Sequence, residues 1–187
     1  MIKKSIARDC VQIQDKICLK PYQKGYEEAF FQLVRKNFDR LQNHFPSLLK
    51  KNESIENTKI YIDEKIKLWN KCQEFAYMIF NEQEIIGHFN IKDIDWKKKT
   101  VELAYWIDSD SENKGIVTNI VKNRINFIFS ELDIIKIIAR CHVENMQSEK
   151  IMQKCGMHYE GTVHNLYKNY QNISVDTYLY SIENNIK

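Results

Sequence analysis

The chain has few residues that interrupt secondary structure, and it contains no long apolar run. Only five glycines and two prolines occur in 187 residues, with no repeat or low-complexity linker, so we expect a single domain over residues 1–187. No stretch of about 18 apolar residues is present, and the N-terminus lacks the apolar segment of a signal peptide. We therefore predict a cytoplasmic protein without a membrane partner.

The cysteines and charges argue against a zinc-binding protein and a nucleic-acid-binding protein. The five cysteines form an odd set without a CxxC pair, which fits a reducing compartment and gives no zinc spacing. The 28 basic and 25 acidic residues are interspersed and leave a net charge of +3, so we predict no nucleic-acid partner. The histidines match no ligand motif, so we predict no metal site and assign structural or rim positions to all five: His44, His88, His142, His158 and His164.

Hydrophobic periodicity predicts an α+β arrangement around one mixed sheet. Apolar residues recur at intervals of three and four in two early segments, which is typical of amphipathic helices. Three apolar runs joined by the polar turns NEQE and DIDWKKK predict an antiparallel meander. In chain order we predict a strand (17–20), helices (23–37 and 57–72), strands (75–80, 85–92 and 100–107), a helix (114–131), a strand (136–142), a helix (146–155) and strands (159–168 and 174–182).

The most informative segment is VELAYWIDSDSENKGIVTNIV, residues 101–121. A strand there ends in a polar turn whose one glycine opens a helix. The first N–H groups of a helix lack internal partners and lie at the positive end of its dipole, so such a junction can hold a phosphate. Many strand-to-helix turns carry a glycine for geometry alone, however. The donors here would be Lys114, Gly115, Ile116, Val117 and Thr118.

A second segment, residues 137–161, contains another strand, a turn at Glu144 and Asn145, and a short helix closed by Gly156. In combination the two segments resemble those of the GNAT superfamily of acyl-CoA-dependent N-acetyltransferases, most closely the RimJ/RimL type that acetylates protein N-termini. The residues that carry the resemblance are Glu102, Tyr105, Trp106, Asp108, Gly115 and Thr118 in the first segment, and Asn145, Ser148, Gly156, Tyr159, Glu160 and Gly161 in the second.

The resemblance implies the GNAT fold, a mixed and mostly antiparallel sheet flanked by helices, with acetyl-CoA as cofactor. It implies acetyl transfer to a primary amine, and the favoured acceptor is the N-terminal α-amine of a protein such as a ribosomal one. An α-amine with a pKa near 8 is roughly a tenth neutral at pH 7, whereas a lysine is neutral only about once in a few thousand. The alternatives are a small amine (a polyamine, an amino acid or an antibiotic) and a catalytically silent acyl-CoA-binding module. A homodimer is compatible with the resemblance.

Two residues are candidates for the chemistry. The resemblance places Glu102 on the central strand facing the acceptor, where it would take the amine proton directly or through water; the alternative is a surface carboxylate. Ser148 lies on the inward face of its helix and would assist the leaving thiolate, or would only satisfy a backbone group in the first helical turn. Many relatives place a tyrosine four residues later, where this chain has Met152.

Three further residues are expected to hold the pantetheine arm. Asn145 matches an asparagine that bonds this arm in the family, although it is equally suited to cap the following helix. Trp106 and Ile107 match the strand that offers its backbone to the pantetheine amides. For Trp106, core packing is the alternative.

The phosphate turn departs from the family pattern. Glu112 stands where Arg or Gln is usual, Asn113 replaces the first glycine, and Val117 replaces a small residue. Asparagine tolerates the left-handed conformation, so the turn can survive. A carboxylate beside a diphosphate is unfavourable, so we predict weaker CoA binding than is typical, with Lys114 and the helix N-terminus providing most of the attraction.

The acceptor is expected to lie between two loops, residues 41–51 and 167–171, because the family sets its acceptor there. His44, Phe45 and Pro46 are candidate pocket walls, and a capping hydrophobic cluster is an equal alternative. The sequence does not identify the acceptor.

Overall fold

The computed structural model describes residues 10–184. Their eight strands form one sheet in the order β1-β2-β3-β4-β5-β6-β8-β7. Every neighbouring pair is antiparallel except β5 and β6, which are parallel. The predicted mixed, mostly antiparallel α+β fold is therefore confirmed. The strands are β1 (Val11–Gln14), β2 (Ile17–Pro21), β3 (Phe75–Asn81), β4 (Glu84–Asp95), β5 (Thr100–Ile107), β6 (Lys136–His142), β7 (His158–Lys168) and β8 (Ser174–Glu183).

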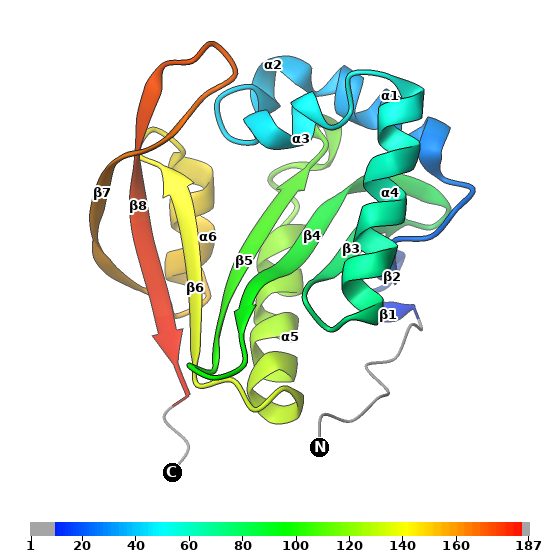
Figure 1. The fold of residues 1–187 in the computed structure, drawn as a ribbon. Helices are drawn as coiled ribbons and strands as arrows, with labels where there is room; N and C mark the ends of the chain where they lie inside the picture. The colour runs from blue at the N-terminus through cyan, green and yellow to red at the C-terminus, as the bar shows by residue number, and fades with distance from the viewer. Residues whose placement is uncertain (1–9, 185–187) are drawn as a thin grey trace.

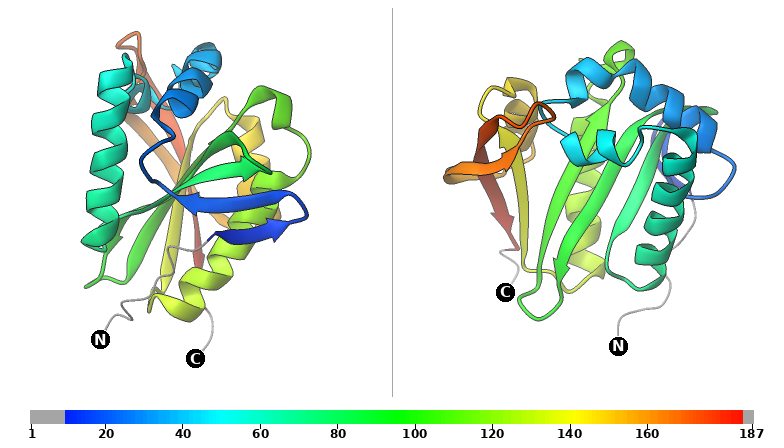
Figure 2. Two further views of the ribbon diagram at one scale, coloured as in Figure 1. Left: turned by 90° about the vertical axis from the view of Figure 1, so that its right-hand side faces the viewer. Right: turned by 45° about the horizontal axis from the view of Figure 1, so that its top comes forward.

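Helices cover both faces of the sheet (Figures 1 and 2). The six residues from Phe75 to Phe80 in β3 are all buried, as expected for a strand covered on both sides. Two apolar clusters result, one on each face of the sheet. The helices are α1 (Glu27–Lys36), α2 (Phe38–Leu41), α3 (Pro46–Lys50) and α4 (Ile55–Asn70) on one side, and α5 (Ile116–Glu131) and α6 (Met146–Lys154) on the other.

The two parallel strands separate halfway along their length. β5 pairs with β6 only from Thr100 to Leu103, whereas its other edge pairs with β4 as far as Ile107. On its other edge, β6 pairs with β8 along its whole length, from Lys136 to His142. Figure 1 shows the upper ends of β5 and β6 diverging. The last residues of β5 thus present one backbone edge that no strand within residues 10–184 covers.

Several elements differ from the sequence predictions. The strand β1 and the short helices α2 and α3 were not predicted; a helix of four or five residues is too short to show a helical period. The first long helix begins at Glu27 rather than residue 23, since Gly25 has a φ of 96° in the turn before it. The helix α4 begins at Ile55, two residues before the predicted start at residue 57. The Ser54 side chain caps it by accepting a hydrogen bond from the Asn57 amide at 3.2 Å.

None of the helices within residues 10–184 has both the length and the apolar character required to cross a membrane.

Candidate active site

The turn before α5 has the conformation of an anion-binding junction. Asn113 and Gly115 have φ angles of 59° and 72°, both in the left-handed region. The helix begins at Ile116, and no side chain among the described residues caps it. Its first amides are therefore free to bind an anion that enters the adjacent cavity.

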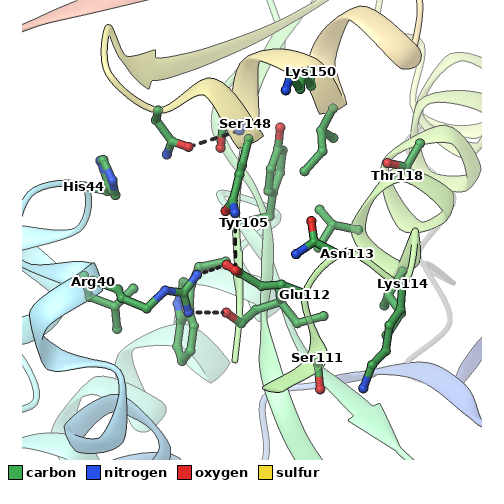
Figure 3. Close-up of a pocket in the computed structure, with 18 of the residues that line it drawn as sticks. Arg40, His44, Tyr105, Ser111, Glu112, Asn113, Lys114, Thr118, Ser148 and Lys150 are labelled. Carbon is green, nitrogen blue, oxygen red and sulfur yellow. Dashed lines mark hydrogen bonds and ion pairs between the residues drawn. The ribbon is translucent and has the colours of Figure 1, made fainter. Parts of the chain in front are cut away.

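That cavity, which we call the cofactor cavity, has a volume of about 580 Å³. It lies between the turn, the free edge of β5, the start of α6 and the α2–α3 segment (Figure 3). All the residues predicted to bind the cofactor line it: Trp106, Ile107, Asn113, Lys114, Gly115, Ile116, Val117, Thr118 and Asn145; so does Ser148.

The free edge of β5 lies beside this cavity, and its side chains are held by the core. Trp106 is buried and packs against Phe30 with ring centroids 6.2 Å apart. The core-packing alternative for this side chain is therefore correct, and it is compatible with the predicted role, which needs only the backbone. Residues 104–107 of β5 are paired with a strand on the β4 side alone. On the other edge the Ile107 carbonyl accepts a hydrogen bond from Arg40, and the remaining backbone groups are available to a ligand's amide groups.

Glu112 does not face the cavity as an unpaired charge. Its carboxylate forms an ion pair with Arg40 of α2 and accepts a hydrogen bond from the Gln147 side chain at 3.3 Å. Arg40 also donates to the Asn37 side chain at 3.0 Å and to the Ile107 carbonyl at 3.2 Å. Figure 3 shows this guanidinium between the carboxylate and the end of β5. The sequence reasoning missed Arg40 because it lies in a segment predicted as a loop.

Lysines from two elements line the same cavity. Lys114 belongs to the turn and donates to the Asp110 carbonyl at 2.7 Å. Lys150 and Lys154 lie one helical turn apart on α6, are exposed, and were also missed. Their spacing of four was a readable signal once the helix was assigned. Together with the uncapped amides of α5, these cations fit the phosphate groups of CoA.

A second cavity, of about 510 Å³, adjoins the first. We call it the acceptor cavity, because Glu102 and residues from both loops predicted to surround the acceptor line it. Asn43 of the α2–α3 loop contacts the other loop, accepting a hydrogen bond from the Tyr167 hydroxyl at 3.2 Å. Five residues line both cavities and mark the place where they meet: His44, Phe45, Tyr105, Asn145 and Ser148.

Glu102 is buried in the wall of the acceptor cavity, with an exposed fraction of 8%. It is therefore not the surface carboxylate of the alternative reading. The Lys92 ammonium lies 3.0 Å from one carboxylate oxygen, and the Arg140 guanidinium pairs with the other. Glu102 does not line the cofactor cavity; it reaches only the adjoining space.

The start of α6 holds the residues at the junction. The Ser148 amide donates to the Asn145 side-chain oxygen at 3.1 Å, so Asn145 caps the helix. This cap engages the oxygen of the side chain, and the same side chain lines both cavities. Because Asn145 provides the cap, the Ser148 hydroxyl is not needed for it.

His44 is another half-buried group at the junction. Its ring lies 5.7 Å from that of His142 in an edge-on arrangement. Burial, with a further contribution from His142, lowers the pKa of His44 below its ordinary value. The predicted walls His44, Phe45 and Pro46 all line the acceptor cavity.

An uncapped helix N-terminus beside a splayed strand, with a second cavity beyond it, is the arrangement that the resemblance implies for an acyl-CoA-dependent transferase. The family described as "Acetyltransferase (GNAT) domain" matches residues 16–158 of the sequence. The chain therefore belongs to the GNAT acetyltransferase family, and the relatives named below include ribosomal-protein acetyltransferases, in line with the resemblance to the RimJ/RimL type. The predicted enzyme class and cofactor, acetyl-CoA-dependent N-acetyltransferase and acetyl-CoA, are confirmed.

Individual relatives agree with this placement. The chain is 24% identical over 155 residues to the ribosomal-protein-serine acetyltransferase of Escherichia coli K12, covering 82% of this chain and 85% of that protein. The solved structure of RimL, a ribosomal L7/L12 α-N-protein acetyltransferase in complex with coenzyme A, superposes with a TM-score of 0.89 at 20% identity, covering 96% of this chain and 100% of RimL. The microcin C7 self-immunity acetyltransferase MccE, solved with acetyl-CoA and AMP, has a TM-score of 0.81 at 23% identity over 92% of this chain and 94% of its own.

Proposed function

We propose that this enzyme acetylates the N-terminal α-amine of a protein, of the kind that its ribosomal-protein acetyltransferase relatives are named for. The observation that carries the proposal is the meeting of the two cavities at Ser148, with Glu102 in the wall of the second. A thioester held in the first cavity would have its leaving sulfur near the serine, and an amine in the second would lie on the side of the carboxylate.

The two side chains have complementary roles in this proposal. Acetyl-CoA supplies an acetyl group on a thiol leaving group. Glu102 accepts the proton that the amine loses as its nitrogen bonds to the acetyl carbon, directly or through a water. Ser148 donates a hydrogen bond to the sulfur as the carbon–sulfur bond breaks, and charge-assisted hydrogen bonds of this kind are the strong ones. The two cavities hold both reactants in place, which removes much of the entropic barrier.

The charges in the acceptor cavity favour a protein N-terminus over a polyamine. A polyamine carries a second ammonium that needs a free carboxylate. Among the described residues that line this cavity, Glu102 is the sole acidic side chain. Its carboxylate already forms ion pairs with Lys92 and Arg140. The acidic residues that the sequence left unplaced, Glu53, Glu56 and Glu82, do not line it. The predicted cytoplasmic location fits this acceptor, and the homodimer stays a prediction.

The proposal is tested by thiol release from acetyl-CoA. We expect turnover with peptides that have a free α-amine, and none with the same peptides blocked at the N-terminus but carrying an internal lysine. Spermidine should be a poor acceptor. Glu102→Gln should lower kcat about 10²- to 10⁴-fold, the usual contribution of a general base, while the Kd of CoA measured by calorimetry stays within twofold.

Three outcomes would contradict the proposal. Preferred turnover of spermidine would indicate the small-amine alternative. Tight CoA binding without turnover of any peptide or amine would indicate the catalytically silent module. Full activity of Glu102→Gln would remove this residue as the base and leave the acetyl transfer itself standing.

A further inference from the structure

Tyr105 is a buried phenol at the junction of the two cavities that the proposed chemistry does not use. It lies on β5 with an exposed fraction of 8%, and it lines both cavities. Its hydroxyl oxygen is inaccessible and has no hydrogen-bond partner among the described residues. Leaving a buried hydroxyl without a partner destabilises a fold, so this hydroxyl calls for a partner that is engaged during function.

Ser148 is a candidate for that partner, because its side chain lines both cavities beside Tyr105. Figure 3 shows Tyr105 next to Ser148, below the start of α6. Burial is the largest influence on the Tyr105 hydroxyl and raises its pKa, while a weak hydrogen-bonding interaction with Ser148 lowers it; the two hydroxyls do not form a hydrogen bond of normal geometry. Both hydroxyls can rotate about their C–O bonds, so a small shift of the serine side chain would pair them.

We propose that Tyr105 is a positioning residue for Ser148: its hydroxyl donates a hydrogen bond to the serine oxygen when the cofactor cavity is filled, and so turns the serine proton toward the leaving sulfur. This inference rests on the function proposed above.

The proposal requires no proton transfer by either hydroxyl. The amine nitrogen bonds to the acetyl carbon, the carbon–sulfur bond breaks, the amine proton goes to Glu102, and the sulfur leaves with its electron pair as a thiolate. Ser148 and Tyr105 keep their protons and donate hydrogen bonds in series. Burial raises the pKa of Tyr105 well above its ordinary value, which is consistent with a phenol that remains protonated.

The test is a double-mutant cycle with Tyr105→Phe and Ser148→Ala. The phenylalanine keeps the ring and removes only the hydroxyl. We expect Tyr105→Phe to lower kcat three- to tenfold with the KM for acetyl-CoA within twofold, and to have no further effect in the Ser148→Ala background. Tyr180→Phe is the matched control, since this buried tyrosine also reaches α6, through Glu149 at 2.8 Å, and lines neither cavity.

A second readout needs no turnover. Calorimetric titration with CoA and with desulfo-CoA measures the preference for the thiol. We expect Tyr105→Phe and Ser148→Ala to reduce this preference by the same factor, and Tyr180→Phe to leave it unchanged. Multiplicative losses of kcat in the two backgrounds, or an unchanged thiol preference in Tyr105→Phe, would overturn the inference while the proposed function stands. An unmodified enzyme that acetylates no amine would overturn both.

Discussion

Arg40 of α2 forms an ion pair with Glu112 beside the cofactor cavity, and this pair neutralises the carboxylate that stands next to Asn113 in the phosphate turn. From the sequence alone, Glu112 predicts weak CoA binding because an unpaired carboxylate would repel a diphosphate. The pairing removes that premise. The two residues are distant in the chain, so the consequence of Glu112 depends on a contact that only the folded structure supplies.

The ion pair predicts an asymmetric response to mutation. Arg40→Ala leaves a half-buried carboxylate without its cation beside the phosphate site, and we expect the Kd of CoA to rise about tenfold, equivalent to about 1.4 kcal/mol. Glu112→Gln should change it less than threefold. Adding Glu112→Gln to Arg40→Ala should restore most of the affinity. Calorimetry with CoA provides the measurement, and a double variant as weak as Arg40→Ala alone would refute the electrostatic explanation.

Lys150 provides a separate electrostatic prediction. It is exposed on α6 and lines the cofactor cavity, so its contribution to binding phosphate should be small and screened by salt. We expect Lys150→Gln to weaken CoA binding two- to fivefold at low ionic strength and to have almost no effect at 1 M salt.

Two controls distinguish this role from a general effect of charge. Pantetheine lacks the phosphates, so its affinity should be the same for Lys150→Gln and the unmodified enzyme. Lys122→Gln removes an exposed lysine on α5 that does not line the cavity, and it should bind CoA normally. A loss of pantetheine affinity in Lys150→Gln would indicate a packing defect instead.

The long helices and strands could be predicted from the sequence because their periods are local properties. The turn at Gly115 was recognisable for the same reason, since glycine and asparagine are the residues that adopt the left-handed conformation. The cation partners of Glu102 were not recognisable. Lys92 faces it through the register of β4 on β5, and Arg140 lies on β6, two residues beyond the one opposite Glu102. Strand register is a tertiary property, so charge pairs across a sheet cannot be read from spacing alone.

The short elements show the same limitation. The segment that contains α2 and α3 carries Arg40 and the walls of the acceptor cavity, but each helix has too few residues to produce an amphipathic pattern. Their position is instead fixed by contacts with the loop between β7 and β8, including a hydrogen bond from the Tyr170 amide to the Gln42 carbonyl at 3.0 Å. The residues most relevant to the acceptor are thus those that the sequence describes least well.

Substitution by alanine should destabilise the protein to different extents at two glycines. At Gly87 of β4, a Cβ would collide with the Trp106 carbonyl oxygen of the adjacent strand, so we expect Gly87→Ala to lower the unfolding free energy by about 3 kcal/mol or more. At Gly115 nothing lies within 4 Å of an added Cβ, and the cost should be the left-handed backbone alone, about 1–2 kcal/mol. Urea unfolding measures both.

The Gly115 position also offers a graded test. Gly115→Asn should cost less than Gly115→Ala, because asparagine tolerates the left-handed region better. Equal destabilisation by alanine and asparagine would indicate that a steric contact, rather than backbone conformation, decides the effect.

His88 should make the protein sensitive to mild acid. It is buried in the wall of the acceptor cavity, where its ring bonds to the Tyr22 hydroxyl at 2.9 Å. Burial, assisted by the positive charge of Lys65, lowers the pKa of His88 from 6.5 to about 3. The unfolded chain therefore binds one more proton than the folded chain between these two values, so this residue's contribution to stability decreases as the pH falls from 6.5 toward 3.

The size of the effect at pH 5 follows from the unfolded state alone, because the native ring is still neutral there. It comes to about 2 kcal/mol lost between pH 7.5 and pH 5. Urea unfolding at the two pH values should show this loss in the unmodified protein and a correspondingly smaller one in His88→Gln, whose side chain cannot titrate but can still bond to Tyr22. His158→Gln, at an exposed histidine, should keep the original dependence. If His88→Gln and the unmodified protein lose stability in parallel, the acid sensitivity arises from other groups.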